Sequence, residues 1–580
     1  MITPMTKYSF ILLTEQTEGF LRSLSEIGLV DIQRGTKPVD DCSLGLLSEI
    51  QAIKKDIACI ENGEDEKLKA MVAQRSALAR KAETLKIWGN YDPEKLEQLA
   101  AQGIKLNFFK VASKKFEEVW KENYPLQIIN EIDGRIYFVI PSVSGEDTVF
   151  PVSPCAAPDE PLRNVLDRID ALDKDIVQYR GELEGRKSLI PSLEATISEK
   201  NALLERNLAK LSSEKAAEET LTTMIGFAPT EDDAKVSAEL DKLDAYYFKE
   251  DAKVEDNPPI KLKNNKFSSM FEVLTGMYGM PVYNEFDPTI FLSIFFLLFF
   301  AMCMGDAGYG ILLILIGLFL KGKEGGLAKL YKLIITLGIG TFVVGIFMGA
   351  CFGVNLTELS WIPDGLKSCM ITGEIAGYSA QMVFALGIGI FHLCLAMIVK
   401  AVYSVKMNGF MNSLSSIGWT LLIVGTVLVL SIALIGLVSE TTAKWIIIGI
   451  AAVSALGIYI FNKIGRNPLA NIGSGLWDTY NMASGLMGDV LSYIRLYALG
   501  LSGGMLGSTF NSIGKMVLGT DPTWQWLPFV LILVIGHALN LAMSCLGAFV
   551  HPLRLNFVEF FKNSGYEGRG ATYRPLKEKY

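Results

Sequence analysis

From residue 289 onward, the sequence consists of long apolar runs separated by short charged loops. A helix needs about 20 apolar residues to cross the hydrocarbon core of a bilayer, and most of these runs approach that length. Inside a membrane every backbone polar group must be paired, so the spans should be helices. The pattern predicts about eight spans. They lie near residues 289–304, 306–320, 332–353, 379–399, 413–437, 444–462, 479–507 and 525–551.

Lysine and arginine are divided unevenly between the loops of this apolar half. Loops after the even-numbered spans carry most of them, whereas the other loops carry little beyond Lys367, Lys444 and Lys515. Loops rich in Lys and Arg stay in the cytosol, so we expect a cell-membrane protein with both termini cytosolic. The residues from Met1 to Ser9 lack the apolar run of a signal peptide, which agrees with this orientation. The cations on the expected cytosolic side are Lys321, Lys323, Lys329, Lys332, Lys400, Lys406, Lys463, Arg466, Arg554, Lys562, Arg569, Arg574, Lys577 and Lys579.

The first half of the chain is rich in Lys and Glu and shows two long heptad-like segments. Apolar residues alternate at three- and four-residue spacing over 50–85 and 162–211, which predicts two coiled-coil helices. We expect a hinge at Asn62-Gly63 and a kink at Pro191. Between the two helices, residues 104–152 alternate as strands do, with a hairpin turn at Asp133-Gly134.

The fold class expected from these patterns is a membrane α-helical protein with an N-terminal cytosolic α+β, coiled-coil two-lobed domain. Shorter strands at 7–14, 29–34 and 245–249 and helices at 19–27 and 231–242 complete the lobe near the membrane. The expected divisions are 1–43 and 216–285 for the near-membrane lobe with its linker, 44–90 and 159–215 for the antiparallel coiled-coil helices, 91–158 for the distal lobe, 286–560 for eight transmembrane helices and 561–580 for a cytosolic tail.

Composition and motifs argue against several functional classes. A net charge of −8 and the lack of a basic patch with interleaved aromatic residues argue against nucleic-acid binding. The eight cysteines form no Cys-x-x-Cys pair and the three histidines show no metal-ligand spacing, so we expect neither metal nor cofactor. The segment Gly181–Ser188 resembles a phosphate-binding loop, but it is one residue short and lies in a heptad helix. We therefore expect no catalytic nucleotide site in this chain.

Arg495 lies in the middle of an apolar run, and no acidic residue is found within one helical turn of it. A charged side chain at the bilayer centre costs about 3 kcal/mol on insertion scales, so such a residue indicates function. A structural role, with the side chain reaching an interface or a neighbouring helix, is the alternative. On an ideal helix the face with Arg495 also carries small residues, which would let a partner helix present an acid. These small residues are Gly488, Ser492, Ala498 and Ser502.

Other polar residues in the apolar half follow a helical spacing. In the last expected span His537, Asn540 and Ser544 recur at i, i+3 and i+7, and His551 and Arg554 continue the line. Such a stripe can line a water-filled path, although for each residue alone a hydrogen bond between helices is the simpler interpretation. Asp489 precedes Arg495 by six residues and should face elsewhere. Asp306 and His392 are isolated, and we expect His392 to be a packed, hydrogen-bonded histidine.

Around Arg495 the sequence Gly-Asp-Val-Leu-Ser-Tyr-Ile-Arg-Leu-Tyr-Ala-Leu-Gly-Leu resembles the penultimate span of the membrane stator subunit of V-type and archaeal-type rotary ATPases. This is subunit a in eukaryotes and subunit I in prokaryotes. Residues 551–559, His-Pro-Leu-Arg-Leu-Asn-Phe-Val-Glu, resemble the last-span signature of that family, and Met304-Gly-Asp-Ala-Gly-Tyr-Gly310 resembles its first spans. The similarity covers the chain end to end.

The resemblance implies roles for particular residues and partners. Arg495 would be the essential arginine facing a rotating proteolipid ring with its ion-binding carboxylate, and Arg554 its supporting arginine. Candidate half-channel or supporting residues are Ser492, Asp489, His537, Asn540, Ser544, His551 and Glu559. Peripheral stalk subunits, a central-stalk subunit capping the ring and the lipid membrane would be the other partners.

The chain departs from the eukaryotic pattern at two positions. Ser544 stands where eukaryotic members have a Glu, and Gly503 where they have a His, so the exit-channel groups are left open. The shorter chain favours a prokaryotic protein. The sequence leaves open H⁺ or Na⁺ as the ion, and pump or synthase as the direction. A standalone secondary transporter or channel with a cytosolic coiled coil is the rival class; paired broken helices in an inverted repeat would support it, and none is evident.

Overall fold

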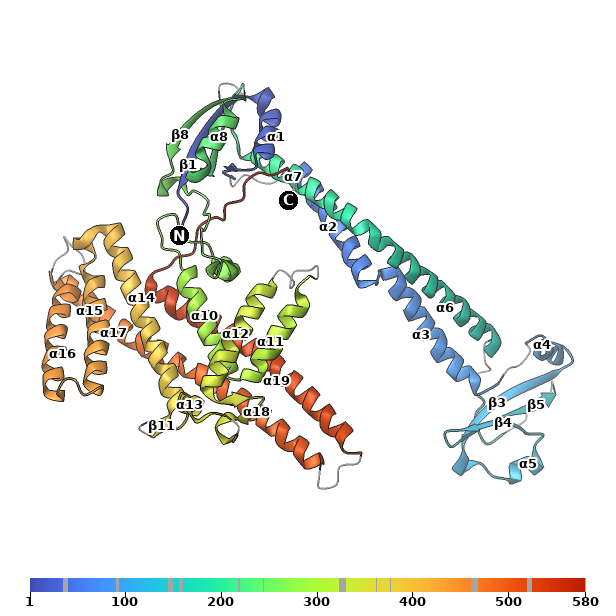
Figure 1. Ribbon diagram of the computed structural model, residues 1–580. Helices are drawn as coiled ribbons and strands as arrows, with labels where there is room; N and C mark the ends of the chain where they lie inside the picture. The colour runs from blue at the N-terminus through green and yellow to red at the C-terminus, as the bar shows by residue number, and fades with distance from the viewer. Residues whose placement is uncertain are drawn as a thin grey trace. The chain divides into compact units, whose positions relative to one another are not determined.

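The computed structural model describes residues 1–34, 40–89, 93–143, 150–155, 160–216, 220–243, 245–322, 330–360, 362–375, 377–460, 468–518 and 524–578 (Figure 1). The chain forms two compact units. One comprises 1–16, 29–33 and 214–575, and the other 17–28, 34–213 and 576–580. Of the loop and tail cations named above, Lys323, Lys329, Lys463, Arg466 and Lys579 lie outside the described residues.

The second unit is built on four long helices that pack in two antiparallel pairs. Helix α3 (Glu66–Lys86) packs on α6 (Leu162–Gly185), and α2 (Asp41–Asn62) packs on α7 (Ile190–Ser212). The expected hinge is present, because α2 ends at Gly63 with a positive φ of 63°. A 3₁₀ turn, Arg186–Leu189, separates α6 from α7, and Pro191 lies in the first turn of α7. Helix α1 (Thr17–Ile27) also belongs to this unit and contacts α7.

Between α3 and α6 the chain forms a small antiparallel sheet. The strands are β3 (Ile104–Ala112), β4 (Gln127–Ile132) and β5 (Arg135–Val143), in the order β3-β5-β4. The turn between β4 and β5 uses Asp133 and Gly134, both with positive φ, as a two-residue hairpin requires. Helices α4 (Pro93–Ala101) and α5 (Val119–Asn123) complete this lobe, and Phe109 and Phe138 stack in its core.

The N-terminal sheet of the first unit has a split β-α-β strand order. Strands β1 (Met5–Leu13), β2 (Asp31–Ile32), β7 (Leu221–Pro229) and β8 (Tyr246–Asp251) lie in the order β2-β7-β1-β8, with β6 (Glu214–Ala216) on β7. Strand β7 is antiparallel to both β1 and β2, and β8 is antiparallel to β1. This is the order of a ferredoxin-like motif, with the whole helical stalk inserted between β2 and β7. Helix α8 (Asp233–Leu240) connects β7 to β8.

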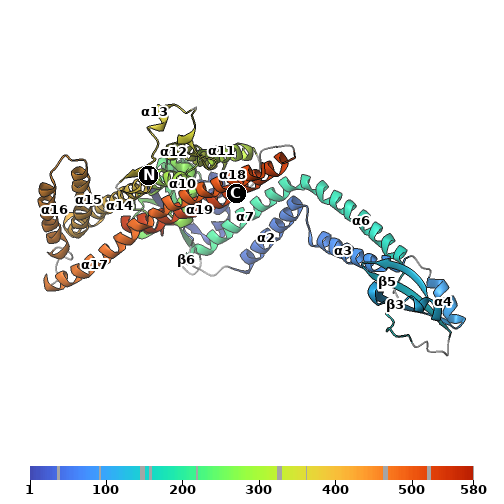
Figure 2. The same cartoon turned by 90° about the horizontal axis from the view of Figure 1, so that it is seen from below.

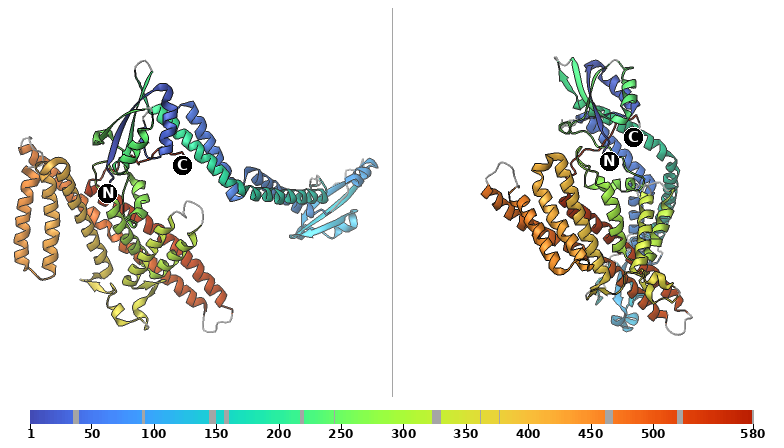
Figure 3. Two further views of the ribbon diagram at one scale, coloured as in Figure 1. Left: turned by 45° about the horizontal axis from the view of Figure 1, so that its top comes forward. Right: turned by 60° about the vertical axis from the view of Figure 1, so that its left-hand side comes forward.

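The membrane half of the first unit contains long apolar helices. Among the described residues, five segments are long and apolar enough to cross a membrane: α12 (Tyr331–Met348), α14 (Ala380–Asn412), α15 (Leu414–Leu434), Glu440–Ile460 and Trp526–Ser564. Helices α10 (Thr289–Met304) and α11 (Ala307–Leu320) are apolar but shorter. The protein is thus a multi-pass membrane protein, and the number eight stays a prediction. Helix α16 (Glu440–Ala455) packs beside α15, which Figure 3 shows in orange.

The remaining elements of this half are α17 (Pro468–Ser492), α18 (Ile494–Leu518), α19 (Trp526–Arg554), a π-helical turn (Leu555–Phe560) and α20 (Phe561–Ser564). Short pieces lie in the connections: α9 (Glu272–Tyr278), α13 (Asp364–Lys367), and the two-residue strand pairs β9 (Ala350–Cys351) with β10 (Val354–Asn355) and β11 (Glu374–Ile375) with β12 (Tyr378–Ser379).

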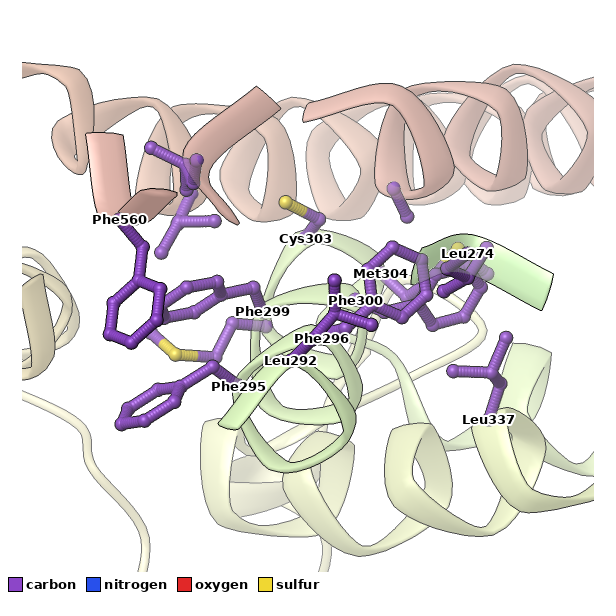
Figure 4. Close-up of a cluster of buried hydrophobic side chains, with 14 of the residues drawn as sticks. Leu274, Leu292, Phe295, Phe296, Phe299, Phe300, Cys303, Met304, Leu337 and Phe560 are labelled. Atoms are coloured by element: carbon purple, nitrogen blue, oxygen red, sulfur yellow. The ribbon is translucent and has the colours of Figure 1, made fainter. Parts of the chain in front are cut away.

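The core of the membrane half is centred on α10. Its aromatic side chains, among them Phe295, Phe296 and Phe299, are buried with residues of α14, α18 and α19. Figure 4 shows Phe295 and Phe299 pointing toward Phe560, and Cys303 lying next to the C-terminal helices. This packing fixes α10 against the helices that carry the polar residues discussed next.

An extended segment after α20 runs back along the first unit to the N-terminal sheet. The Gly570 N–H donates to the Met280 carbonyl oxygen (2.8 Å), and the Ile260 N–H donates to the Ala571 oxygen (2.7 Å). Farther on, the Arg574 N–H donates to Oδ2 of Asp31 (2.7 Å). We call residues 566–574 the C-terminal strap, because they join the last membrane helix to the sheet.

Candidate functional site

The expected seventh span, 479–507, is not one helix. Helix α17 ends at Ser492 and α18 begins at Ile494, with Tyr493 in the turn between them; in Figure 2, α17 leads into α18, which lies beside α19. The backbone hydrogen bonds here join residues three positions apart, as in a 3₁₀ turn. The Tyr493 N–H donates to the Val490 carbonyl oxygen (3.2 Å), and the Leu496 N–H donates to the Tyr493 carbonyl oxygen (3.0 Å). The prediction of a span here gave no sign of the break, because apolar residues continue across it.

Arg495 lies in the first turn of α18, directly after this break. Its side chain is half-buried, and its Nη1 atom is fully buried with no hydrogen-bond partner among the described residues. A buried donor without a partner costs about 1–3 kcal/mol, and more when it is charged. The described part of the chain therefore provides no hydrogen-bond acceptor for this cationic donor.

The small residues expected to share a face with Arg495 belong to two helices. Gly488 and Ser492 lie on α17, while Ala498 and Ser502 lie on α18, so the face drawn on one ideal helix is divided at Tyr493. Gly488, Ala498 and Ser502 are exposed. The surface next to Arg495 is thus lined by small side chains and is open in this chain.

Toward the C-terminal end of α18, three predicted residues of α19 form a buried hydrogen-bond network. Asn540 donates through Nδ2 to the Tyr309 hydroxyl (2.7 Å) and to the Gly503 carbonyl oxygen (2.9 Å). Ser544 donates to Oδ1 of Asn540 (3.2 Å), and Nδ1 of His537 lies 2.9 Å from the Tyr309 hydroxyl. The stripe of His537, Asn540 and Ser544 is therefore present. His537 and Asn540 bond to other helices, whereas Ser544 bonds to Asn540 within α19.

The partners of His537 fix its protonation state. Asn511 donates through Nδ2 to the Phe352 carbonyl oxygen (2.7 Å). Its Oδ1, 3.1 Å from Nε2 of His537, therefore accepts a hydrogen bond from the imidazole. The Tyr309 hydroxyl accepts from Asn540 and donates to Nδ1 of His537. The hydrogen-bond partners thus assign a neutral imidazole protonated at Nε2. We call Tyr309, Asn511, His537, Asn540 and Ser544 the Tyr309 network.

Asp306 anchors the backbone that carries Tyr309. It is 1% exposed, and its carboxylate accepts N–H bonds from Gly308 (2.8 Å), Tyr309 (3.3 Å), Phe352 (2.8 Å) and Gly353 (2.8 Å). Two of these donors belong to the first turn of α11, so Asp306 is the N-cap of that helix. The other two are in the loop after α12. The motif residue Asp306 is therefore a structural clamp that holds Tyr309 beside α19.

A second polar group lies at the other end of α19. Asn563 donates to Oδ2 of Asp489 (2.8 Å), and Nζ of Lys562 lies 3.8 Å from the same atom. The Glu559 side chain is 2% exposed, lies beside Ser492, and its Oε2 has no hydrogen-bond partner in the described part of the chain. We call these five residues the Asp489 cluster. As expected, Asp489 does not pair with Arg495.

His551 and Arg554 lie between the two groups and belong to neither. Nδ1 of His551 is buried and has no partner within the described ranges, and the Arg554 side chain is exposed. The expected line of five polar residues on α19 therefore divides into two parts. The first three belong to the Tyr309 network, and the last two, His551 and Arg554, do not. The axial distance from His537 to Arg554 is about 25 Å, at 1.5 Å per residue.

Each polar group opens into a cavity of the membrane half. A cavity of about 410 Å³ lies beside α18 and includes Asn511, Lys515 and Glu358 in its lining. Another, of about 360 Å³, includes Asp489, Lys562 and Lys400. Among the described residues, no group of His, Cys, Asp or Glu side chains gathers as metal ligands. A proton or another cation in either cavity could contact polar side chains. The first cavity is lined in part by residues of α18 and the second by residues of α17, the helices on either side of the break at Tyr493.

Sequence reasoning missed Tyr309, Asn511 and Asn563 as members of these groups. Tyr309 stood in the quoted motif around Asp306, but its pairing with His537 joins residues more than 200 positions apart. Asn511 lies on α18 at a helical spacing from Gly503 and Gly507, both of which are buried. That pattern of small and amide residues was the available signal.

These features define a class: a multi-pass membrane protein that carries arginine side chains on its membrane helices between two polar groups, with an α+β N-terminal part. A family model, the V-type ATPase 116kDa subunit family, matches residues 161–351. The "A-type ATP synthase subunit I" of Methanocaldococcus jannaschii is 31% identical over 475 residues, which cover 72% of this chain and 68% of that protein. The chain belongs to the V-type ATPase 116kDa subunit family, together with the subunit I proteins of A-type and V-type ATP synthases.

Other relatives extend the similarity over the full length. The "V-type ATP synthase subunit I" of Borreliella burgdorferi is 25% identical, and the match covers 100% of both chains. A crystal structure of the cytoplasmic N-terminal domain of subunit I, homolog of subunit a, of V-ATPase matches 42% of this chain at 14% identity. Its TM-score of 0.18 is too low to support an argument about the fold.

Proposed function

We propose that this chain is the membrane-embedded stator subunit of a V/A-type rotary ATPase, and that Arg495 faces the ion-binding carboxylate of a proteolipid ring. The observation that carries the proposal is the buried Nη1 of Arg495, which has no partner among the described residues. A ring carboxylate arriving at the open small-residue surface would meet the half-buried guanidinium there.

The two polar groups support a pair of half-channels. The Tyr309 network and the Asp489 cluster lie toward opposite ends of α19, each next to a cavity, and Arg495 and Arg554 lie between them. An ion would enter beside one group, bind to the ring and leave beside the other. Ionisable residues inside membrane domains commonly mark such paths.

Arg495 would act on the ring carboxylate in two ways. A guanidinium attracts and stabilises the ionised acid, so it drives release of the bound ion as the carboxylate passes. The guanidinium stays charged at any physiological pH, so it also repels cations that would leak directly between the half-channels. Arg554, exposed near the same level of α19, is the supporting cation.

The soluble parts would hold the membrane half still. We propose that the α3–α6 and α2–α7 helix pairs and their distal lobe bind peripheral stalk subunits, while the ring carries a central-stalk cap subunit. In this assembly torque turns the ring relative to this chain. The positive loops support a cytosolic position for both termini in this proposal.

The test is ATP-driven ion uptake into inverted membrane vesicles that contain the whole complex. Arg495→Ala should abolish uptake while the complex still assembles. Adding Na⁺ or a protonophore to the wild type identifies the transported ion. Normal uptake in Arg495→Ala vesicles would overturn the proposal.

The alternative is a standalone secondary transporter or channel. The unmatched charge of Arg495 does not distinguish the two, but purification does. A stator subunit should co-purify with a proteolipid ring and ATPase subunits, whereas a transporter should be active as the isolated chain in proteoliposomes.

A further inference from the structure

His392 of α14 is a buried polar residue that reaches the helix break before Arg495. It is 0% exposed, and its Nδ1 lies 2.9 Å from the hydroxyl of Tyr493. The imidazole stacks on Phe560 with ring centroids 4.6 Å apart and an angle of 7°, and Phe295 lies 4.1 Å away on centroids. The hydrogen bond to Tyr493 is therefore held by a ring that cannot easily turn.

Tyr493 occupies a slot built for its ring. The side chain is fully buried, and a Cβ placed on Gly389 of α14 would lie 2.3 Å from the tyrosine ring. Only glycine leaves room at that position. The tyrosine is thus fixed on α14 from two sides, by the space at Gly389 and by the bond to His392.

Tyr493 is also the point at which the helical hydrogen-bond pattern changes. Around it, backbone hydrogen bonds between residues three positions apart replace the regular α-helical bonds between residues four positions apart. Side-chain contacts must therefore set the direction in which α18 starts. Arg495 follows two residues later, in the first turn. A small change in direction at the break moves a long guanidinium by a larger amount, and errors of about 1 Å at a reacting group can cost about 100-fold in rate.

We propose that His392 is a positioning residue, which holds Tyr493 in the break between α17 and α18 and thereby sets the place of the Arg495 guanidinium. The inference rests on the proposed role of Arg495. It adds a residue of α14, about 100 positions earlier in the chain, to those on which coupled transport depends.

The experiment uses the whole complex in vesicles and measures ions transported per ATP hydrolysed. Tyr493→Phe keeps the aromatic ring and removes the hydroxyl that bonds His392. His392→Phe keeps an aromatic ring and removes the nitrogen that bonds Tyr493. Each should lower the ratio roughly three- to tenfold, the range that one lost hydrogen bond supports, while the amount of assembled complex stays normal. The double variant should be no worse than either single one, because both remove the same bond. His392→Gln, which can still bond the hydroxyl, should restore part of the ratio.

Tyr459→Phe is the matched control, since it also removes a tyrosine hydroxyl that bonds another helix. Its partner, at 3.1 Å, is Thr479 of α17, far along that helix from the break. It should leave the ratio unchanged. If Tyr493→Phe and His392→Phe also leave it unchanged while Arg495→Ala abolishes transport, the positioning role is wrong and the proposed function stands. If Arg495→Ala still transports, the proposed function fails. Additive effects of the two single variants would assign them to packing and overturn the inference.

Discussion

Several polar atoms of the membrane half are buried without partners in the described part of the chain. Among them are Nη1 of Arg495, Nδ1 of His551 and Oε2 of Glu559. Native proteins satisfy the great majority of such atoms. These three residues lie on α18, on α19 and in the π-helical turn after α19, and they differ from the bonded Tyr309 network nearby.

Replacing Arg495 with lysine tests whether charge alone is sufficient. Lysine keeps the charge but lacks the planar fork that meets a carboxylate with two bonds. We expect Arg495→Lys to reduce ATP-driven uptake by about tenfold or more, since a hydrogen bond to a charged group contributes about 1.5–3 kcal/mol. The measurement is initial uptake rate per assembled complex. Uptake at the wild-type rate would show that a point charge suffices.

Asn540 is the residue on which the Tyr309 network depends most. It is 1% exposed and makes bonds to Tyr309, Gly503 and Ser544. Asn540→Ala should lower the free energy of unfolding by about 1–3 kcal/mol, because the Gly503 carbonyl loses its donor in a dry site. Thermal unfolding of the purified chain in detergent measures this.

Ser544→Ala is the comparison for that prediction. It removes only the terminal bond of the network, which lies within α19, and such a hydrogen bond contributes about 0.5–1.5 kcal/mol. A loss for Ser544→Ala equal to that for Asn540→Ala would contradict the network as described.

At the scale of elements, local signals predicted local structure well. Asn62-Gly63 and Asp133-Gly134 indicated a hinge and a hairpin, and both are present. The strand expected at 245–249 is β8, which pairs with β1. The break at Tyr493 escaped prediction because it depends on a slot at Gly389 and a bond from His392, which are distant in sequence.

Asp233 of α8 ties its helix to two strands. Its carboxylate accepts the Tyr8 hydroxyl of β1 and lies 3.2 Å from Nζ of Lys249 on β8. The hydrogen bond from Tyr8 and the nearby ammonium of Lys249 hold the pKa of Asp233 below its usual value. A carboxyl with a lowered folded pKa contributes stability above its unfolded pKa of about 3.9, and this is lost as pH falls through the folded pKa.

The prediction concerns Asp233→Asn compared with the wild type. At pH 7 the variant should be less stable in this sheet by about 1 kcal/mol, and the difference should shrink below about pH 4. Amide hydrogen exchange of β1 and β8, compared between the two proteins at each pH, measures it. Glu250→Gln, an exposed change on β8, should show no such trend. A difference that grows on acidification would contradict the assignment.

At the scale of the whole molecule, the C-terminal strap depends on very close backbone contacts. A Cβ on Gly570 would lie 1.9 Å from the Pro281 carbonyl oxygen, and one on Gly279 would lie 2.0 Å from the Gly568 oxygen. Glu285 adds a bond, since its Oε1 accepts the Glu567 N–H at 2.8 Å. The strap can lie here only because both sides have glycine at the contacts.

Gly570→Val should therefore displace the strap. We expect amides in 258–262 and 279–285 to exchange with solvent at least about tenfold faster, because backbone overlap of this size must open the contact. Hydrogen exchange with mass spectrometry of the full chain measures it. Arg569→Ala, an exposed change one residue away, is the control. Unchanged exchange in Gly570→Val would show that the strap is not needed there.

The strap was not predictable from the sequence. Residues 561–580 are polar and charged, and nothing in their pattern indicates pairing with Ile260 or Met280. The composition shows that the chain has an apolar half and a charged half. It does not show that backbone hydrogen bonds of the strap join the two, because those bonds form only in the tertiary structure. Arg495 was found because it conflicts with its surroundings, and the Tyr309 network was found in part because its residues keep helical spacing.

The strap also sets an order on synthesis. Strand β1 leaves the ribosome first, but residues 570–574, which hydrogen-bond with Ile260 and Asp31, are made after every membrane helix. At 5–20 residues per second, about 30–110 s separate the two. Throughout that interval the N-terminal sheet is incomplete at its junction with the membrane half. A chain in which translation stops before residue 570 therefore lacks this closure, and its Ile260 N–H has lost the carbonyl that accepts it in the finished protein.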